Sequence, residues 1–301
     1  MRNNVLKWIL FLALSLIWGS SFILMKLGMN ALSAFQVASL RITASGLVML
    51  PMALKSFRSI PRNKLAPVFF SGVLGSLLPS YLFCWAETGI DSSLAGALNA
   101  LTPIFTILTG VLFFQLRTTA QKVIGIVVAF SGCMILFFNE AMLSENEQYG
   151  YLFFVLVATV SYGLNVNLVH QYLKDIPSLQ IVAVAMTLCA IPALGVLIGT
   201  GYFSMKMSGQ FTVSTGYALL LGAVGTSLAN ILFYILIKKA GSLFASMVTY
   251  GIPFVAFGWG WIVQEKLSWM QVLALFVILA GVYIANASPF LSSGGSKEQK
   301  K

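Results

Sequence analysis

The stretch that decides the fold is GVLGSLLPSYLFCWAETGIDSSLAGALNALTPIFTILTGVLFFQLRTTAQKVIGIV, residues 72–127. Eleven of its residues recur 150 positions later without a gap. They are Gly72, Gly75, Leu78, Leu82, Phe83, Ser92, Ala95, Pro103, Gly110, Gln121 and Val127, repeated as Gly222, Gly225, Leu228, Leu232, Phe233, Ser242, Ala245, Pro253, Gly260, Gln271 and Val277. The hydrophobic stretches before residue 72 recur at an offset of 144, as Gly19 and Gly163 illustrate. The chain is therefore an internal duplication, with one plan in residues 1–145 and again in 146–290.

The composition requires a membrane. Of the 301 residues, 58% are hydrophobic and only 9% are charged, whereas soluble domains carry about a quarter charged residues. A helix needs about 20 apolar residues to span a bilayer core. We place ten such segments at 8–27, 34–54, 66–86, 92–114, 120–138, 149–170, 178–199, 215–237, 242–263 and 269–286. We expect an all-α integral membrane protein of a cell (inner or plasma) membrane, with a disordered tail at 291–301.

The basic residues predict the orientation in that membrane. With a cytoplasmic N-terminus, fourteen Lys and Arg residues fall on the cytoplasmic side and only Lys26, Lys206 and Lys266 on the other. This positive-inside bias places both termini in the cytoplasm. The net charge of +10 then reflects topology, and we expect no nucleic-acid partner. The acidic residues at the outer side are Glu87, Asp91, Glu140, Glu145, Glu147 and Glu265.

Ten spans give five in each repeat, and an odd number of crossings inverts the second copy relative to the first. Such inverted repeats are related by a pseudo-two-fold axis in the membrane plane, with a substrate site near the midplane between the halves. The sequence therefore predicts two inverted five-helix repeats that open a central cavity to one side and then to the other.

Polar residues at equivalent positions in the two halves predict the lining of that cavity, because a polar group facing lipid is costly. On the first and sixth spans, Trp18 and Ser21 correspond to Tyr162 and Asn165. Ser80 and Asn230 correspond on the third and eighth spans, as Asn99 and Thr249 do on the fourth and ninth. The predicted cavity residues are Trp18, Ser21, Ser80, Tyr81, Asn99, Thr102, Tyr162, Asn165, Asn230, Thr249 and Tyr250.

Each of these residues also has an alternative interpretation. Ser, Thr and Asn often hydrogen-bond between packed membrane helices. Amides are better candidates for a wet cavity, because they have two donors and an acceptor to satisfy. Pro103 and Pro253 are expected to loosen their helices, either as static kinks or as bends used during transport.

Arg41 is the one charge well inside a predicted span. It either pairs within the bundle and serves the transport path, or snorkels to the outer surface. The acids Glu87, Glu140 and Glu265 lie at span ends, so we expect no buried acid of the kind used in a proton relay. The fifth and tenth spans instead carry Gly125, Ala129, Gly132, Ala274, Gly281 and Ala285, which predict close packing between halves or between the protomers of a homodimer.

The sequence argues against an enzyme. The single histidine, His170, lies at a span end, and no Cys/His cluster or phosphate-binding loop is present. We therefore expect no catalytic residues, no cofactor and no metal. The three cysteines all fall inside predicted spans, which is typical of buried packing rather than of disulfides.

The segments IWGSSFILMKLGM (17–29), SLRITASGLVML (39–50), ALNALTPIFTILTGVLF (97–113) and IGIVVAFSGCMIL (124–136) resemble the EamA family of the drug/metabolite transporter superfamily. The resemblance implies ten helices in two inverted repeats and export of small metabolites or amino acids from a bacterial cell. It places the family's Trp-Gly pair on Trp18 and Gly19, its arginine on Arg41, and its prolines on Pro103 and Pro253. The glutamate that closes these helices is Glu265 in the second half, whereas the first half has Gln115.

We therefore expect a secondary transporter in contact with the lipid bilayer, with a small-molecule substrate and amino acids as the leading class. A phosphorylated-sugar or nucleotide-sugar exchanger is the alternative within transport, although it would need more than one cation in the cavity. A lipid scramblase or a structural membrane partner is the alternative from another class.

Overall fold

The computed structural model describes residues 2–116, 119–143, 149–233, 235–236, 239, 248–265 and 268–286. Over these residues every regular element is a helix, so the predicted all-α class is confirmed there. The predicted disordered tail at 291–301 lies outside the described residues, as do Glu145, Glu147, Ser242, Ala245 and Lys266.

The order of elements follows the predicted spans closely. The α-helices are α1 (Arg2–Gly28), α2 (Ala34–Ser56), α3 (Arg62–Gly72), α4 (Leu78–Ala86), α5 (Ser92–Asn99), α6 (Thr102–Phe114), α7 (Ala120–Leu143), α8 (Tyr149–Tyr172), α9 (Ser178–Gly199), α10 (Gly209–Leu220), α12 (Val248–Ile262) and α13 (Trp269–Asn286). Short 3-10 turns lie at η1 (Phe57–Ser59) and η3 (Tyr202–Ser204). Two π-helical segments, η2 (Val73–Leu77) and η4 (Leu221–Leu228), follow α3 and α10 directly.

Six helical segments of the described chain are long and apolar enough to cross a membrane. They are Val5–Gly28, Ala34–Ser59, Arg62–Ala86, Gly150–Tyr172, Ser178–Gly199 and Gly209–Phe233. The bent pair α5 and α6 makes a seventh if it counts as one span. Shorter apolar helices at Ala120–Leu136, Val248–Ile262 and Trp269–Ala285 coincide with the remaining predicted segments.

The segment predicted as one helix at 92–114 is broken, because α5 and α6 meet at 42°. Pro103 lies in the first turn of α6 and has no N–H to donate to the carbonyl of Asn99, four residues earlier. That carbonyl instead accepts a hydrogen bond from Thr102 Oγ1 at 2.8 Å. Pro103 therefore marks a break in the chain, whereas its counterpart Pro253 lies inside α12.

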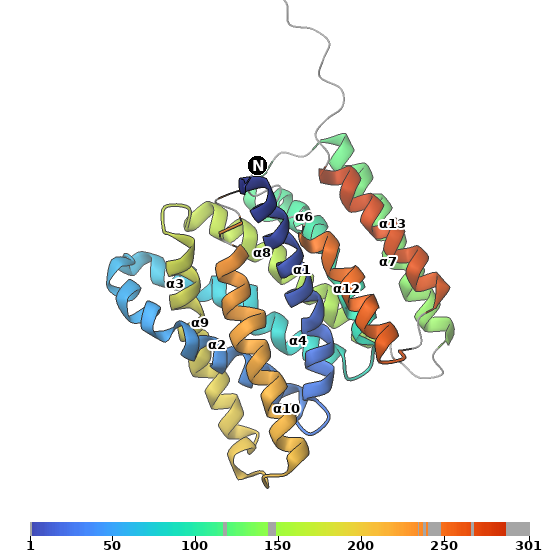
Figure 1. Ribbon diagram of the computed structural model, residues 1–301. Coiled ribbons are helices and arrows are strands. Elements are labelled where there is room, and N and C mark those ends of the chain that lie inside the picture. The colour runs from blue at the N-terminus through green and yellow to red at the C-terminus, as the bar shows by residue number, and fades with distance from the viewer. Residues whose placement is uncertain are drawn as a thin grey trace, which may run out of the picture.

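The helices pack in pairs that join distant parts of the sequence. α2 packs on α9, α7 on α13, α1 on α12 and α6 on α8. Figure 1 shows α7 and α13 side by side at one edge of the molecule. Small residues allow that close contact, since a Cβ at Gly125 would lie 2.6 Å from the carbonyl oxygen of Gly281. The small-residue stripes predicted on the fifth and tenth spans thus face each other within one chain.

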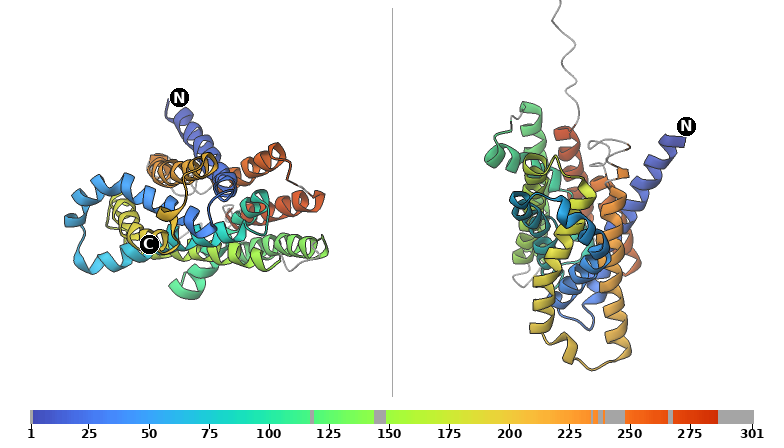
Figure 2. Two further views of the ribbon diagram at one scale, coloured as in Figure 1. Left: turned by 90° about the horizontal axis from the view of Figure 1, so that it is seen from below. Right: turned by 90° about the vertical axis from the view of Figure 1, so that its left-hand side faces the viewer.

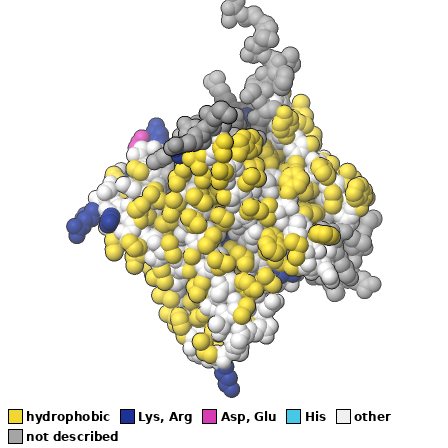
Figure 3. Space-filling view, viewed as in Figure 1, with side chains coloured by type: hydrophobic (Ala, Val, Ile, Leu, Met, Phe, Trp, Pro, Cys, Tyr) yellow, Lys and Arg dark blue, Asp and Glu magenta, His cyan; other side chains and the backbone are white. Residues whose placement is uncertain are grey.

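The two ends of the bundle differ. α1 begins at one end, and the connection between α9 and α10 forms the opposite tip (Figures 1 and 2). Hydrophobic side chains cover most of the visible face in Figure 3, while Lys and Arg stand out at that tip and at one edge. Large apolar side chains such as Leu112, Phe113 and Trp261 are exposed in the isolated chain. This distribution is what lipid contact requires.

The largest buried cluster lies between the halves. It includes Phe22 of α1, Phe83 of α4, Leu98 of α5 and Ile252 of α12. Cys84, Cys133 and Cys189 are buried free thiols, as their positions in the predicted spans indicated.

Candidate functional site

Trp18 of α1 contacts the π-helical segment of the other half. Its Nε1 donates a hydrogen bond to the carbonyl oxygen of Gly225 at 3.1 Å, and its ring centroid lies 5.2 Å from that of Phe233. Ser21, one turn later on α1, would lie 3.1 Å from a Cβ at Gly225. Its hydroxyl donates to the carbonyl of Ile17. Two predicted residues of the first span thus meet η4, and π-helical turns are frequent at functional sites.

The sixth span makes the equivalent contact with the first π-helical segment. Asn165 of α8 lies against Gly75 of η2, where a Cβ would come to 3.0 Å from its Cγ. The Oδ1 of Asn165 is buried and has no hydrogen-bond partner among the described residues. Tyr162 stacks on Phe83, with ring centroids 6.2 Å apart. Asn165 therefore presents an unused acceptor inside the bundle.

Arg41 points into the bundle rather than toward the outer surface. Its Nε donates to Thr226 Oγ1 of η4 at 3.0 Å, and its guanidinium contacts Met25 Sδ at 3.6 Å. Thr226 and Met25 are both neutral, so neither contact is an ion pair. Of the two interpretations left open by the sequence, the structure favours pairing within the bundle.

Tyr81 of α4 is held by the second span. Its hydroxyl lies 2.7 Å from Ser39 Oγ, and its ring centroid is 5.9 Å from that of Phe35. Ser80, the neighbouring residue, is buried. These contacts fix an aromatic ring and a hydroxyl near the end of α2 that carries Arg41.

The break between α5 and α6 positions two further predicted residues. Asn99 is buried and ends α5, and Thr102 begins α6. Thr102 Oγ1 donates to the backbone carbonyl of Asn99 and lies 3.4 Å from its Oδ1. Both contacts join the last residue of α5 to the first residue of α6, so they stabilise the bend between the two helices.

The predicted residues of the second half are more scattered. Asn230 is partly buried and lies four residues after Thr226, on the same side of that helix. Tyr250 donates from its hydroxyl to the carbonyl of Val282 on α13 at 3.4 Å, and Thr249 beside it is partly buried. The Tyr250 hydroxyl therefore makes a packing contact between α12 and α13.

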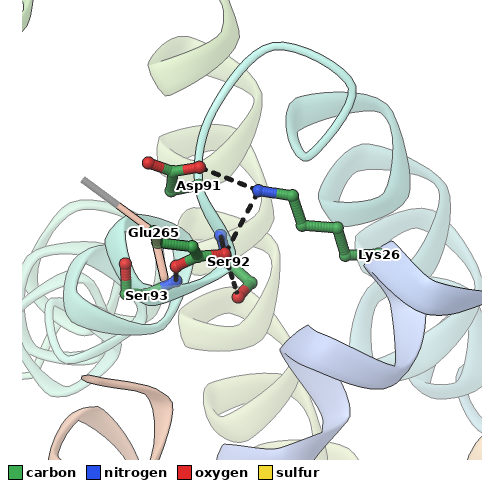
Figure 4. Close-up of polar contacts among 5 residues, drawn as sticks. All are labelled: Lys26, Asp91, Ser92, Ser93 and Glu265. Atoms are coloured by element: carbon green, nitrogen blue, oxygen red, sulfur yellow. Dashed lines mark hydrogen bonds and ion pairs between the residues drawn. The ribbon is translucent and has the colours of Figure 1, made fainter. Parts of the chain in front are cut away.

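A cluster that the sequence did not predict ties one end of the bundle together. Lys26 at the end of α1 donates to Asp91 Oδ1 at 2.8 Å and to Glu265 Oε1 at 3.1 Å. Glu265 also accepts from the backbone nitrogens of Ser92 and Ser93, at 3.0 and 3.1 Å. Figure 4 shows these five residues, which we call the clasp.

The clasp holds a charged carboxylate at the start of α5. Burial alone would raise the pKa of Glu265, but hydrogen bonds from Ser92 and Ser93 and the charge of Lys26 bring it below its ordinary value. A carboxylate at a helix N-terminus is also favoured by the helix dipole. The ionised clasp therefore joins α1, α5 and the segment after α12.

Two further polar residues were missed. The expectation of no buried acid is wrong for Glu87, whose side chain is only 4% exposed at the end of α4. The sequence placed it correctly at a span end but could not show that neighbouring helices cover it. Asn167 Nδ2 donates to Thr106 O, Thr109 Oγ1 and Gly163 O. The amide criterion that selected Asn165 would also have selected Asn167, two residues later.

Comparisons with known proteins agree with this architecture. The family model of the EamA-like transporter family matches residues 6–138 and again 149–287. An uncharacterized transporter of Archaeoglobus fulgidus is 27% identical, over 92% of this chain and 98% of its own. The uncharacterized inner membrane transporter YedA of Escherichia coli is 23% identical, over 93% and 92%.

Two further similarities add detail. A probable terminal-alkyne amino-acid exporter of Streptantibioticus cattleyicolor is 24% identical, over 77% of this chain and 82% of its own. A crystal structure of a protein at 18% identity covers 95% of this chain and 97% of its own, with a TM-score of 0.58, which shows a shared fold. With both family matches and the apolar helices together, the chain belongs to the EamA-like transporter family and is a multi-pass membrane protein.

Proposed function

We propose that this protein is a secondary transporter that exports small polar or amphipathic metabolites, with amino acids as the leading class, by alternating access. The observation that carries the proposal is the contact of Arg41 with Thr226, at 3.0 Å, deep between the two halves. A charge inside a membrane protein is retained for function as a rule, and here it lies beside the π-helical segment η4.

The packing of equivalent elements supports two inverted five-helix repeats, at 1–145 and 146–290. α2 and α9 are counterparts and pack on each other, as α7 and α13 do. The contact of α1 with α12 has its counterpart in that of α8 with α6. A pseudo-two-fold axis would produce this exchange of partners. With both termini cytoplasmic, the clasp lies at the outer side.

The unequal ends of the bundle support alternating access. Glu265 closes one end through Ser92 and Lys26. Its counterpart in the first half is the neutral Gln115, which adopts a left-handed conformation after α6. The arrangement described here therefore corresponds to a state closed at the clasp, and breaking the clasp opens the outer side.

The polar groups suit a zwitterion. The guanidinium of Arg41 is a donor for a carboxylate, and the unused Oδ1 of Asn165 is an acceptor for an ammonium group. Tyr162, which stacks on Phe83 and lies within electrostatic reach of Arg41, adds an aromatic surface. The amino-acid exporter of Streptantibioticus cattleyicolor supports the same substrate class.

The proposal is tested with purified protein in liposomes and a panel of radiolabelled amino acids, nucleosides and sugar phosphates. Saturable amino-acid uptake that Arg41→Gln abolishes, while the variant remains monodisperse, supports it. Uptake of sugar phosphates alone favours the exchanger instead. Lipid scrambling without uptake of any panel member rejects transport of small metabolites.

A further inference from the structure

Glu87 has the surroundings of a group that binds a proton. Its side chain is 4% exposed, and neither carboxyl oxygen has a hydrogen-bond partner among the described residues. Phe83, Ala86 and Ile90, on both sides of it in the chain, belong to the largest apolar cluster. An ionised carboxylate without partners in such surroundings is strongly disfavoured, so the neutral acid is the stable form.

The charges near Glu87 do not replace the missing partners. Lys26 of α1 and Arg41 of α2 attract the carboxylate, whereas Glu265 beyond α12 repels it. Both cations donate elsewhere, Lys26 to Asp91 and Glu265, and Arg41 to Thr226.

Two further titratable groups near this place are Cys84, one turn earlier on α4, and Tyr151 of α8, which lies against Gly89. Neither is a cation that could pair with a carboxylate. Burial is the largest influence and raises the pKa of Glu87 well above its ordinary value; among the smaller influences, Lys26 and Arg41 lower that pKa and Glu265 raises it.

We propose that Glu87 is a proton-binding site whose occupancy is linked to closure of the clasp. In the closed arrangement Glu87 carries the proton as a neutral acid. When the clasp opens, water reaches the side chain, and the acid dissociates into a carboxylate and a proton taken by that water. The inference rests on the proposed alternating access, and it adds a proton as a coupled ligand.

Thermodynamic linkage gives the direction of the effect. Because the closed form holds one more proton than the open form, lowering the pH favours closure and raising it favours opening. For one linked proton, the equilibrium constant for opening changes by up to about tenfold per pH unit. A variant with glutamine at this position resembles the protonated acid and should stay closed at every pH.

The reporter for opening is Ser93→Cys in a chain that also carries Cys84→Ala, Cys133→Ala and Cys189→Ala. Ser93 is itself a member of the clasp and is only 1% exposed in the closed arrangement. A cysteine at this position keeps the hydrogen bond from the backbone nitrogen to Glu265. The rate of labelling by a membrane-impermeant thiol reagent is measured from pH 5.5 to 8.5.

The labelling rate of this reporter is divided by that of the same reporter with Glu87→Gln, which removes the intrinsic pH dependence of the thiol reaction. We expect the ratio to rise severalfold or more across the range. Equal profiles in the two proteins overturn the inference. Asp175→Asn removes an exposed carboxylate and is the control for a loss of charge. It should leave the profile of the reporter unchanged.

Glu87→Met provides a second variant without a titratable group if Glu87→Gln does not fold. The melting temperature of the native chain should fall as pH rises, relative to either variant, because the neutral acid stabilises the closed fold below the raised pKa. Parallel melting curves overturn the inference. Neither measurement needs a substrate, so a failure of amino-acid uptake rejects the proposed function without deciding the role of Glu87.

Discussion

Glu265 accepts two hydrogen bonds from Ser92, at 3.0 Å from the backbone nitrogen and 2.7 Å from the hydroxyl, although 173 positions separate them in the chain. One carboxylate thus caps the start of α5 from the far end of α12. Glu265 holds the first residues of α5, and α5 ends at the break at Asn99 and Thr102. A movement of the clasp that shifts α5 would therefore also shift the break.

The first prediction concerns the pH dependence of the clasp. The pKa of Glu265 is below its ordinary value, so its stabilising contribution is complete above the unfolded pKa of about 4.3 and is lost as pH falls through the lower folded pKa. At pH 7, Glu265→Gln should lower the free energy of unfolding by about 1–3 kcal/mol. Thermal unfolding in detergent at pH 7 and pH 4 measures both effects.

The control for this prediction is Asp91→Asn. The side chain of Asp91 is 36% exposed, so its ion pair with Lys26 is screened by solvent and its loss should cost less than about 1 kcal/mol. Equal destabilisation by Asp91→Asn and Glu265→Gln would contradict the prediction that Glu265 contributes more to stability than Asp91.

A second prediction concerns the acceptor for Arg41. Thr226→Val keeps the side-chain shape but removes the oxygen 3.0 Å from the Arg41 Nε. A hydrogen bond to a charged group contributes about 1.5–3 kcal/mol, so initial rates of amino-acid uptake should fall about tenfold or more. Thr226→Ser retains the hydroxyl and should stay within about twofold of the native rate. The idea fails if the valine and serine variants transport equally well.

A third prediction separates two neighbouring amides. The two N–H groups of Asn167 Nδ2 share three acceptors, including Thr106 O on α6 at 2.9 Å. Asn167→Ala should therefore destabilise the fold by about 1–3 kcal/mol. The Oδ1 of Asn165 has no partner among the described residues, so Asn165→Ala should preserve stability while lowering uptake. Thermal unfolding and transport, measured on the same preparations, distinguish the two roles; loss of folded Asn165→Ala would assign that residue to packing.

A fourth prediction tests the contact between α7 and α13. A Cβ at Gly125 would lie 2.6 Å from the Cβ of Ala285 and equally close to the carbonyl of Gly281, where backbone cannot move aside. Gly125→Ala should lower the free energy of unfolding by about 1–3 kcal/mol. At Gly195 of α9 nothing lies within 4 Å, and Gly195→Ala should stabilise the chain by about 0.5–1 kcal/mol. Equal melting temperatures for the two variants would argue against tight packing at Gly125.

Periodicity and composition predicted the helices well, because apolar length is dictated by the bilayer. The second span predicted at 34–54 is α2 (Ala34–Ser56), and the seventh at 178–199 is α9 (Ser178–Gly199). The sequence predicted that Pro103 loosens its helix, and the 42° bend between α5 and α6 lies there, but the interruption of the helix was not predicted. Pro103 disfavours a continuous helix there, whereas Pro253 is accommodated within α12, and the sequence around each proline is similarly apolar.

The candidate site was predictable where polarity alone marks a residue. Trp18, Asn165 and Arg41 all contact the other half or its π-helical segments. Glu87 and the clasp were missed for a physical reason, because burial and ion pairing at the end of a span depend on which helix ends meet. Lys26 and Glu265 lie 239 positions apart, and no local pattern connects them.

The pairing of α7 with α13 also has a consequence for synthesis of the chain. Gln121 at the start of α7 donates to the carbonyl of Ile284, 163 residues later, and Gly125 faces the same helix. When α7 leaves the ribosome and enters the bilayer, the face that will receive α13 has only lipid against it. A nascent chain truncated before its last helix would leave a groove lined by glycine and an amide open to the bilayer. Such a groove is a feature by which membrane quality control could distinguish unfinished copies from complete ones.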